Sequence, residues 1–194
     1  MGKKTFSKTC LAVCGGIFLA HTVFPFAVPP GFAEREPYVA PPYTPPPPAV
    51  SDLVLTDNGD GTVSTPDYKL MWARKDSYAD LGKCLNWHEA VEYVDNLQTG
   101  GYRDWRLPRL AELGVIYDNT RENVMAWDHN PEYPLALDKK FADGAAYWYW
   151  SADYAKTRLT DCCARSLYFV TGLVHLRRLS MCADGGVRAV RDIR

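Results

Sequence analysis

Hydrophobic positions recur with helical spacing in the middle of the chain. Residues 86–97 carry apolar side chains at i, i+3, i+4, i+7 and i+10, a single helical stripe formed by Trp87, Ala90, Val91, Val94 and Leu97. Asn86 can cap this helix, with Glu89 reaching back to its backbone, and Gly100-Gly101 ends it. A second helix is predicted to start at Pro108, because proline suits a first helical position. Its expected buried face is Leu110, Leu113, Ile116 and Tyr117.

Short runs with strand character lie before and after these helices. Residues 53–55 and 62–64 are predicted to form a hairpin around the Asp- and Gly-rich turn 57–61. The turn also matches part of a calcium loop, with Asn58, Asp60, Ser64 and Asp67 at ligand positions. Thr56 stands where such a loop begins with Asp, and Pro66 blocks the exit helix, so the sequence favours a hairpin turn.

The last third of the chain predicts further strands. Residues 121–146 are mostly loop, and residues 147–151 form a compact aromatic strand. Residues 167–170 and 173–176 predict a hairpin in which Thr171-Gly172 is a two-residue turn, and residues 187–191 a closing strand. One hairpin face then holds Leu167, Phe169, Val174 and Leu176, and the other holds Ser166, Tyr168, His175 and Arg177. Two helices with short antiparallel strands, without βαβ alternation, indicate an α+β fold.

The N-terminal residues have the features of an export signal. Lys3, Lys4 and Lys8 precede an apolar run, and Gly31-Phe32-Ala33 offers small residues for cleavage, so residues 1–33 are predicted to be a signal peptide. Two alternatives stay open. The leader is a retained membrane anchor, although glycine, histidine and proline interrupt it, or it is a lipoprotein signal ending at Cys14. All three interpretations place the domain in the periplasm, on the cell surface or outside the cell, with membrane contact only through an uncleaved or lipidated leader.

Residues 34–50 contain seven prolines and no residues able to form a core. Such a composition favours extended polyproline II and predicts a semi-rigid spacer, with a docking site for a proline-binding domain as the alternative. Residues 51–194 then form the folded domain. The whole chain of 194 residues is 47% hydrophobic with a formal charge of −1, which indicates a real core and argues against a nucleic-acid partner.

Charge is unevenly distributed within the domain. Residues 51–155 hold 10 Lys and Arg against 18 Asp and Glu, whereas residues 156–194 hold 8 against 3. In the proposed hairpin register Arg165 stands opposite Arg178, an unfavourable pair unless an anion lies between them. Neutralisation by the acidic part of the domain is one explanation. The other is a patch for sulfated or carboxylated glycans formed by Arg165, Arg177 and Arg178, with Tyr168 assisting.

Four cysteines remain after removal of the leader, and an exported protein is expected to pair them. Cys163 and Cys182 have the same parity in the hairpin, which predicts a Cys163–Cys182 bond, with Cys84–Cys162 as the second bridge. Because the diagonal distance is borderline for a disulfide, Cys162–Cys182 is the fallback. A redox or metal-binding role is not favoured, because there is no CxxC motif.

Catalytic and cofactor motifs are absent from the sequence. His88-Glu89 begins like a zinc-protease motif, but Glu92 occupies the position that needs the second histidine. The chain has no GxSxG, no phosphate-binding glycine loop and no dinucleotide fingerprint. We therefore predict no catalytic residues, no metal site and no cofactor.

An ordered series of motifs resembles the Lcl C-terminal domain family, a bacterial domain family of unknown function. The resemblance spans about residues 52–194 and is carried by residues 60–63 (DGTV), 70–72 (LMW), 87–90 (WHEA), 100–108 (GGYRDWRLP), 112–113 (EL), 149–151 (YWS) and 187–191 (VRAVR). It implies a C-type-lectin-like domain, also similar to formylglycine-generating enzymes, and an adhesin-like role toward sulfated polysaccharides. Within the WRLP run, Trp105 and Leu107 are expected in the core and Arg106 is expected to fork onto a carboxylate or carbonyls.

Three functions follow as hypotheses. The leading one is an exported, non-enzymatic recognition or adhesion domain for a polyanionic glycan or a cell-envelope partner. The second is a structural or assembly subunit of an envelope complex. The third is an enzyme of the formylglycine-generating type, which requires a functional cysteine pair that the Cys162-Cys163 context does not reproduce.

Overall fold

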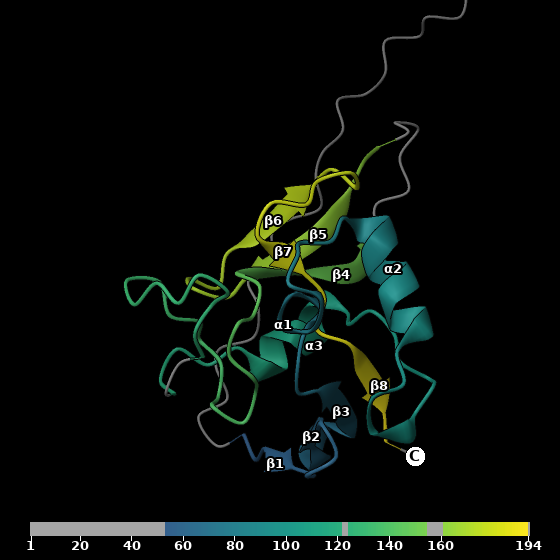
Figure 1. Ribbon diagram of the computed structural model, residues 1–194, viewed down its shortest axis with the longest axis vertical. Helices are drawn as coiled ribbons and strands as arrows, with labels where there is room; N and C mark the ends of the chain where they lie inside the picture. Colours follow the sequence, from purple (N-terminus) through teal and green to yellow (C-terminus); the bar gives the residue numbers. More distant parts are fainter. Residues whose placement is uncertain (1–52, 122–123, 155–160, 194) are drawn as a thin grey trace, which may run out of the picture. The chain divides into compact units, whose positions relative to one another are not determined.

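Within residues 53–121, 124–154 and 161–193, which the computed structural model describes, the chain forms two four-stranded sheets and three α-helices (Figure 1). The helices are α1 (Ser77–Leu81), α2 (Trp87–Asn96) and α3 (Leu110–Ile116), with short 3-10 turns at Pro66–Tyr68 and Thr99–Gly101. The predicted α+β class is confirmed. The predicted signal peptide (1–33) and linker (34–50) lie outside the described residues, among which no helix is long and apolar enough to cross a membrane.

The first sheet is antiparallel and has the strand order β1–β2–β3–β8. Its strands are β1 (Thr56–Asp57), β2 (Thr62–Thr65), β3 (Leu70–Ala73) and β8 (Val190–Asp192). Every residue of β2 and β3 is buried, and Val63 pairs with Trp72 at their centre. Because β8 pairs with β3, the two ends of the described chain share one sheet.

The turn between β1 and β2 is the hairpin turn that the sequence favours over a calcium loop. The side-chain amide of Asn58 donates to the hydroxyls of Thr62 and Ser64, each at 2.8 Å, so these groups satisfy one another. The predicted strand over residues 53–55 is wrong, since pairing begins only at Thr56. Leu53 and Leu55 are nevertheless buried, because burial does not require strand pairing.

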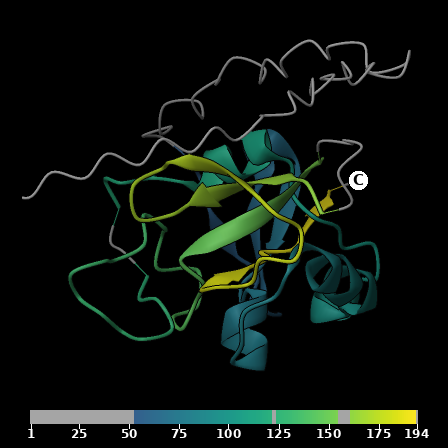
Figure 2. The same cartoon turned by 90° about the horizontal axis from the view of Figure 1, so that it is seen from above.

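The second sheet has the order β6–β5–β4–β7 and contains β4 (Trp148–Tyr154), β5 (Ala164–Tyr168), β6 (Val174–Arg177) and β7 (Gly185–Gly186). β4 is the predicted aromatic strand, and it pairs with β7 in parallel and with β5 antiparallel. Glycine is needed at position 185, where a Cβ atom would lie 2.2 Å from the Trp148 ring. Seen from above, these strands cross the centre of the folded unit (Figure 2).

The register of the β5–β6 hairpin differs from the predicted one. Leu167 pairs with Val174 and Arg165 with Leu176, so residues 169–172 form a longer loop than the expected two-residue turn. Phe169 causes the difference: it is fully buried, and its amide donates to the Tyr147 carbonyl at 2.9 Å instead of continuing the hairpin. The two-residue shift keeps each side chain on its predicted face, but Arg165 does not stand opposite an arginine.

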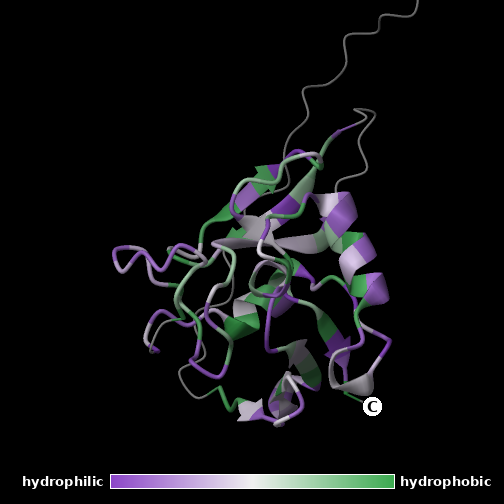
Figure 3. Cartoon of the chain, in the orientation of Figure 1, coloured by the Kyte–Doolittle hydropathy of each residue, from purple (hydrophilic) through white to green (hydrophobic). Residues whose placement is uncertain are grey.

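The central helix agrees with its prediction. α2 begins after Asn86, whose side chain accepts from the Glu89 amide at 3.0 Å while the Glu89 carboxylate accepts from the Asn86 amide at 2.8 Å. Hydrophobic and hydrophilic residues both occur along α2 (Figure 3), as expected for a helix with one apolar and one polar face.

The other two helices show where sequence patterns were insufficient. α3 starts two residues later than Pro108, because Arg109 stays extended and the Glu112 carboxylate accepts from its backbone amide at 2.7 Å. α1 was not predicted. It has only five residues and is capped by Asp76, a side chain that is itself fully buried. One hydrophobic cluster joins residues of both sheets with α3.

Candidate ligand-binding site

The structure brings together two of the four predicted ligand-binding residues. Tyr168 and Arg177 belong to one face of the β5–β6 hairpin, whereas Arg165 belongs to the other face, paired with Leu176. Arg178 follows β6 and is exposed. The three predicted arginines therefore do not share one binding surface.

Tyr168 and Arg177 line a surface hollow of about 420 Å³. Its lining comes from strands β4, β5 and β6, from the loop before β4 and from the residues before β7. We call it the aromatic hollow and define it by Asp128, Asn130, Tyr133, Tyr147, Trp148, Tyr168, Arg177, Ala183 and Asp184.

Three contacts hold Arg177 in this hollow. Its guanidinium carbon lies 4.1 Å from the centre of the Trp148 ring, a cation–π contact, and its Nε donates to the Ser166 hydroxyl at 2.9 Å. A weaker contact runs from Nη1 to the Met181 sulfur at 3.3 Å. Burial lowers the pKa of Arg177, yet the group remains charged at neutral pH. These contacts fix the plane of the guanidinium and leave part of its hydrogen-bonding edge to a ligand.

Tyr147 and Tyr168 keep their protons at neutral pH. Burial, followed by a hydrogen bond to Asp128, raises the pKa of Tyr147, whose hydroxyl lies 2.8 and 3.0 Å from the two carboxylate oxygens. Burial also raises the pKa of Tyr168, whose ring centre lies 6.3 Å from that of Tyr147. Burial and the nearby charge of Arg177 lower the pKa of His175, which leaves that ring neutral at pH 7. Two phenol rings and a neutral imidazole thus border the cation.

The charges of the aromatic hollow are mixed. Among the described residues that line it, Arg177 is the one cation, whereas Asp128 and Asp184 are carboxylates. Carboxylate oxygens accept hydrogen bonds from hydroxyl groups, and a guanidinium donates them in a planar fork. The hollow therefore offers flat apolar rings together with both kinds of hydrogen-bonding group.

Sequence reasoning missed most of this lining. Trp148 and Tyr147 were expected only as strand residues, and Asp128, Asn130 and Tyr133 lie in a segment interpreted as plain loop. The available signal was composition: residues 127–133 combine two aromatics with polar side chains of the kind that bind ligands. Asp184 had no signal, because only the β4–β7 pairing brings it to the site.

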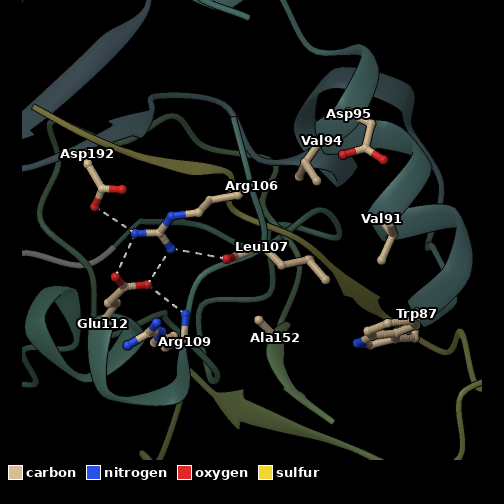
Figure 4. A pocket seen from close by; sticks show the side chains of 10 residues that line it. All are labelled: Trp87, Val91, Val94, Asp95, Arg106, Leu107, Arg109, Glu112, Ala152 and Asp192. Carbon is tan, nitrogen blue, oxygen red and sulfur yellow. Dashed lines mark hydrogen bonds and ion pairs between the residues drawn. The ribbon is translucent and has the colours of Figure 1, made fainter. Parts of the chain in front are cut away.

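A larger hollow of about 520 Å³ lies between α2 and the N-terminus of α3 (Figure 4). Trp87, Val91 and Val94 form its apolar wall, and Arg106 stands on the opposite side. Both Nη atoms of Arg106 bond the Glu112 carboxylate at 2.8 Å. We call this second feature the Arg106 groove.

The terminal nitrogens of Arg106 are hydrogen-bonded to other groups of the same chain. Beyond Glu112, Nη2 donates to Asp192 at 2.9 Å and Nη1 to the Leu107 carbonyl at 3.3 Å. The hydrogen bond to Glu112 is the main cause that raises the pKa of Arg106 above its ordinary value. The predicted fork onto a carboxylate is confirmed, and it joins α3 to β8.

A family model for the Lcl C-terminal domain matches residues 61–191, which is more than half of the chain. The chain belongs to the Lcl C-terminal domain family. No curated protein sequence matches it. In this member of the family, the matched region contains the whole lining of the aromatic hollow and all of the lining of the Arg106 groove except Asp192.

The disulfide pattern of this Lcl C-terminal domain corrects the predicted one. Cys84 is bonded to Cys182 with a Cα–Cα distance of 5.4 Å, and Cys162 is bonded to Cys163. The predicted Cys163–Cys182 and Cys84–Cys162 bonds, and the fallback Cys162–Cys182, are wrong. They assumed that β6 continues toward Cys182, but the chain turns after Arg178, whose carbonyl accepts from the Met181 amide at 3.0 Å.

The Cys84–Cys182 bond supports the aromatic hollow directly. Ala183 and Asp184, which line the hollow, follow Cys182, and the Ala183 carbonyl accepts from the Trp148 ring N–H at 2.8 Å. The bond thus ties the residues before β7 to the segment between α1 and α2.

The His88-Glu89 pair, which begins like a zinc-protease motif, has a structural explanation: Glu89 caps α2, and His88 is exposed. Across the described ranges, no cluster of three His, Cys, Asp or Glu residues is arranged to hold a metal ion.

Proposed function

We propose that this Lcl C-terminal domain is an exported, non-catalytic recognition domain that binds a glycan in the aromatic hollow. The observation that carries the proposal is Arg177 placed over the Trp148 ring in a hollow that Tyr168 and two carboxylates also line. Sugar rings present C–H groups on their faces and hydroxyl groups on their edges. An aromatic ring packs against the C–H groups, and carboxylates and a guanidinium form hydrogen bonds with the hydroxyl groups.

The charges of the hollow narrow the class of glycan. A densely sulfated chain would bring several anions close to Asp128 and Asp184, which costs electrostatic energy in a partly buried site. A sugar with a single carboxylate or sulfate can instead place that group on Arg177 and its hydroxyls on the carboxylates. The proposed ligand is therefore a glycan with few, separated acidic groups.

Export is part of the proposal, and the Cys84–Cys182 bond supports it. Disulfides persist in oxidising compartments and are rare in the cytosol. An adhesive role on a cell surface or in the periplasm agrees with a domain that follows a proline-rich segment. A structural subunit of an envelope complex is the alternative, and it predicts a protein partner in place of a glycan.

A glycan array with neutral, carboxylated and sulfated oligosaccharides tests the proposal. Arg177→Ala and Tyr168→Ala are expected to weaken binding at least about tenfold, equivalent to about 1.4 kcal/mol. Arg178→Ala is the matched control, because it removes the same charge from an exposed position outside the hollow. Equal losses for Arg177→Ala and Arg178→Ala would show general charge attraction and contradict the site. Co-purification of a stoichiometric envelope protein without glycan binding would favour the assembly alternative.

A further inference from the structure

A second aromatic platform lies on the surface of the domain. Tyr78 of α1 and Trp127 of the loop before β4 are stacked, with ring centres 5.5 Å apart and planes inclined by 19°. Trp127 is 41% exposed, a large fraction for this side chain. The pair borders a shallow hollow of about 330 Å³, which is completed by Ala79, Gly82, Asp143 and Gly144. No part of the site described above uses it.

This platform is connected to the aromatic hollow through two carboxylates. Trp127 directly precedes Asp128, whose carboxylate accepts from the Tyr147 hydroxyl. On the other side, Gly186 follows shortly after Asp184, and a Cβ atom at Gly186 would lie 3.7 Å from the Tyr78 amide nitrogen. After burial, the charges of Asp184 and Asp128 are the causes that raise the pKa of Tyr78. Asp128 and Asp184 therefore line the aromatic hollow and also lie close to the Tyr78–Trp127 pair.

The backbone holds the platform in place. The Trp127 amide donates to the Ala145 carbonyl at 3.0 Å, and Ala126 forms a parallel bridge with Ala145. The Met125 amide donates to the Asp143 carboxylate at 2.8 Å. An exposed ring on a tied loop is pre-organised, so a ligand that stacks on it loses little affinity to ordering.

We infer that Tyr78 and Trp127 form a second subsite for the same glycan chain, and that this subsite takes an uncharged or amino sugar. The inference rests on the proposed function of the aromatic hollow. An oligosaccharide bound at both places crosses Asp128 and Asp184, which accept from its hydroxyls. The carboxylates beside Trp127, including Asp143, disfavour an acidic sugar there, so the acidic group belongs at Arg177.

Binding measured against oligosaccharide length tests this inference. The probes are disaccharides and octasaccharides of hyaluronan, which alternates acidic and uncharged sugars, of uncharged chitin and of densely sulfated heparin. We expect wild type to prefer the hyaluronan octasaccharide to its disaccharide, and Trp127→Ala to weaken only the octasaccharide, by about tenfold. Trp127→Phe keeps an aromatic face and should retain most of the preference. Circular dichroism of each variant verifies folding.

Tyr154→Ala is the matched control. Tyr154 is also 41% exposed and stacks on Trp87 at 5.4 Å, but it lies outside both hollows. Binding of the octasaccharide that is equal in Trp127→Ala and wild type overturns the second subsite and leaves the proposed function standing. Strongest binding by heparin, unaffected by Trp127→Ala, also overturns it. Failure of wild type to bind any of the three series removes the proposed function itself.

Discussion

Arg188 and Arg177 come from the same basic part of the chain but have opposite surroundings. Arg188 is fully buried, and its guanidinium donates to the carbonyls of Ala73 and Arg74 and to the Tyr149 hydroxyl at 2.8–3.1 Å. Arg177 lies in an open hollow, where an indole ring and one hydroxyl hold it. The first arginine is enclosed by the fold and out of reach of a ligand, whereas the second has donors that a ligand can reach.

Because some arginines are bonded within the fold, the net charge of a segment was a poor guide to the position of a binding site. Arg191 donates to the Asp104 carboxylate at 2.7 Å and lies 3.9 Å from the Tyr102 ring centre, and Arg106 is bound by Glu112. Several arginines in this family member therefore pair with acidic residues of the earlier sequence. Within residues 156–194, Arg191 pairs with Asp104 and Arg188 with Asp76, so acidic residues of the earlier sequence neutralise part of this positive charge.

The largest change in the free energy of unfolding is expected for a substitution of the buried Arg188. Arg188→Met leaves Asp76, which is 3.9 Å from the Arg188 guanidinium and fully buried, without a counter-charge. Removing one partner of a buried ion pair costs about 3–5 kcal/mol of unfolding free energy. Urea denaturation measures the loss, and Arg178→Met should change the free energy by less than about 0.5 kcal/mol. Equal effects of these two variants would show that burial and pairing with Asp76 do not make Arg188 important for stability.

The Cys84–Cys182 bond joins the segment between α1 and α2 to the residues before β7 that line the aromatic hollow. The double variant Cys84→Ser/Cys182→Ser removes a cross-link between residues 98 positions apart. We expect a loss of about 2–4 kcal/mol in unfolding free energy, because the unfolded chain gains freedom. Denaturation under non-reducing conditions measures it. Stability equal to wild type would show that the bond does not constrain the chain.

Arg121 contributes to stability in a way that depends on pH. Burial alone would raise the pKa of Asp118 and Asp138, but hydrogen bonds and the charge of Arg121, 2.7 Å from each carboxylate, lower both pKa values. A lowered folded-state pKa contributes stability above the ordinary value near 3.8, and this stability is lost as the pH falls through the folded-state pKa.

Arg121→Gln is therefore expected to cost about 2 kcal/mol at pH 7 and progressively less as the solution is acidified below the ordinary Asp pKa. Chemical denaturation of wild type and variant between neutral and acidic pH gives the difference curve. A difference that stays constant over this range would show that Arg121 does not act through these carboxylates.

A much smaller effect on stability than that of Arg188→Met is expected at Arg177. Arg177→Ala loses one cation–π contact and one hydrogen bond at a partly exposed position, so we expect a change below about 1 kcal/mol. The same variant is expected to lose glycan binding. Parallel urea denaturation and array binding separate the two quantities. Destabilisation as large as that of Arg188→Met would mean that Arg177 is a structural residue.

Local patterns in the sequence predicted most elements of this fold. The apolar stripe and capping residues of α2 depend on neighbours three and four positions apart, and the aromatic run of β4 is equally local. The hairpin register failed because Phe169 is drawn into the core by contacts with Tyr147 and Ala136, which are distant in sequence. The disulfide prediction used that register and failed with it.

The candidate site was less predictable, because long-range pairing assembles it. Arg177 was predicted from the clustering of arginines and Tyr168 as an assisting aromatic, and the hairpin alternation correctly put both on one face, since residues on one face of a strand follow a period of two. Asp128 and Asp184 reach the hollow only through the loop before β4 and the parallel β4–β7 pair. No local pattern encodes those approaches, so the mixed charge of the site could not be inferred beforehand.

Glycan binding at the aromatic hollow can be followed through the indole N–H signals of the tryptophans. A two-dimensional ¹⁵N NMR titration with the oligosaccharide selected by the array is expected to shift the Trp148 indole signal, which lies beside Arg177 and Ala183. The signal of Trp72, buried in the other sheet, should stay in place. A shift of the Trp87 signal with Trp148 unchanged would place the ligand in the Arg106 groove and contradict the account.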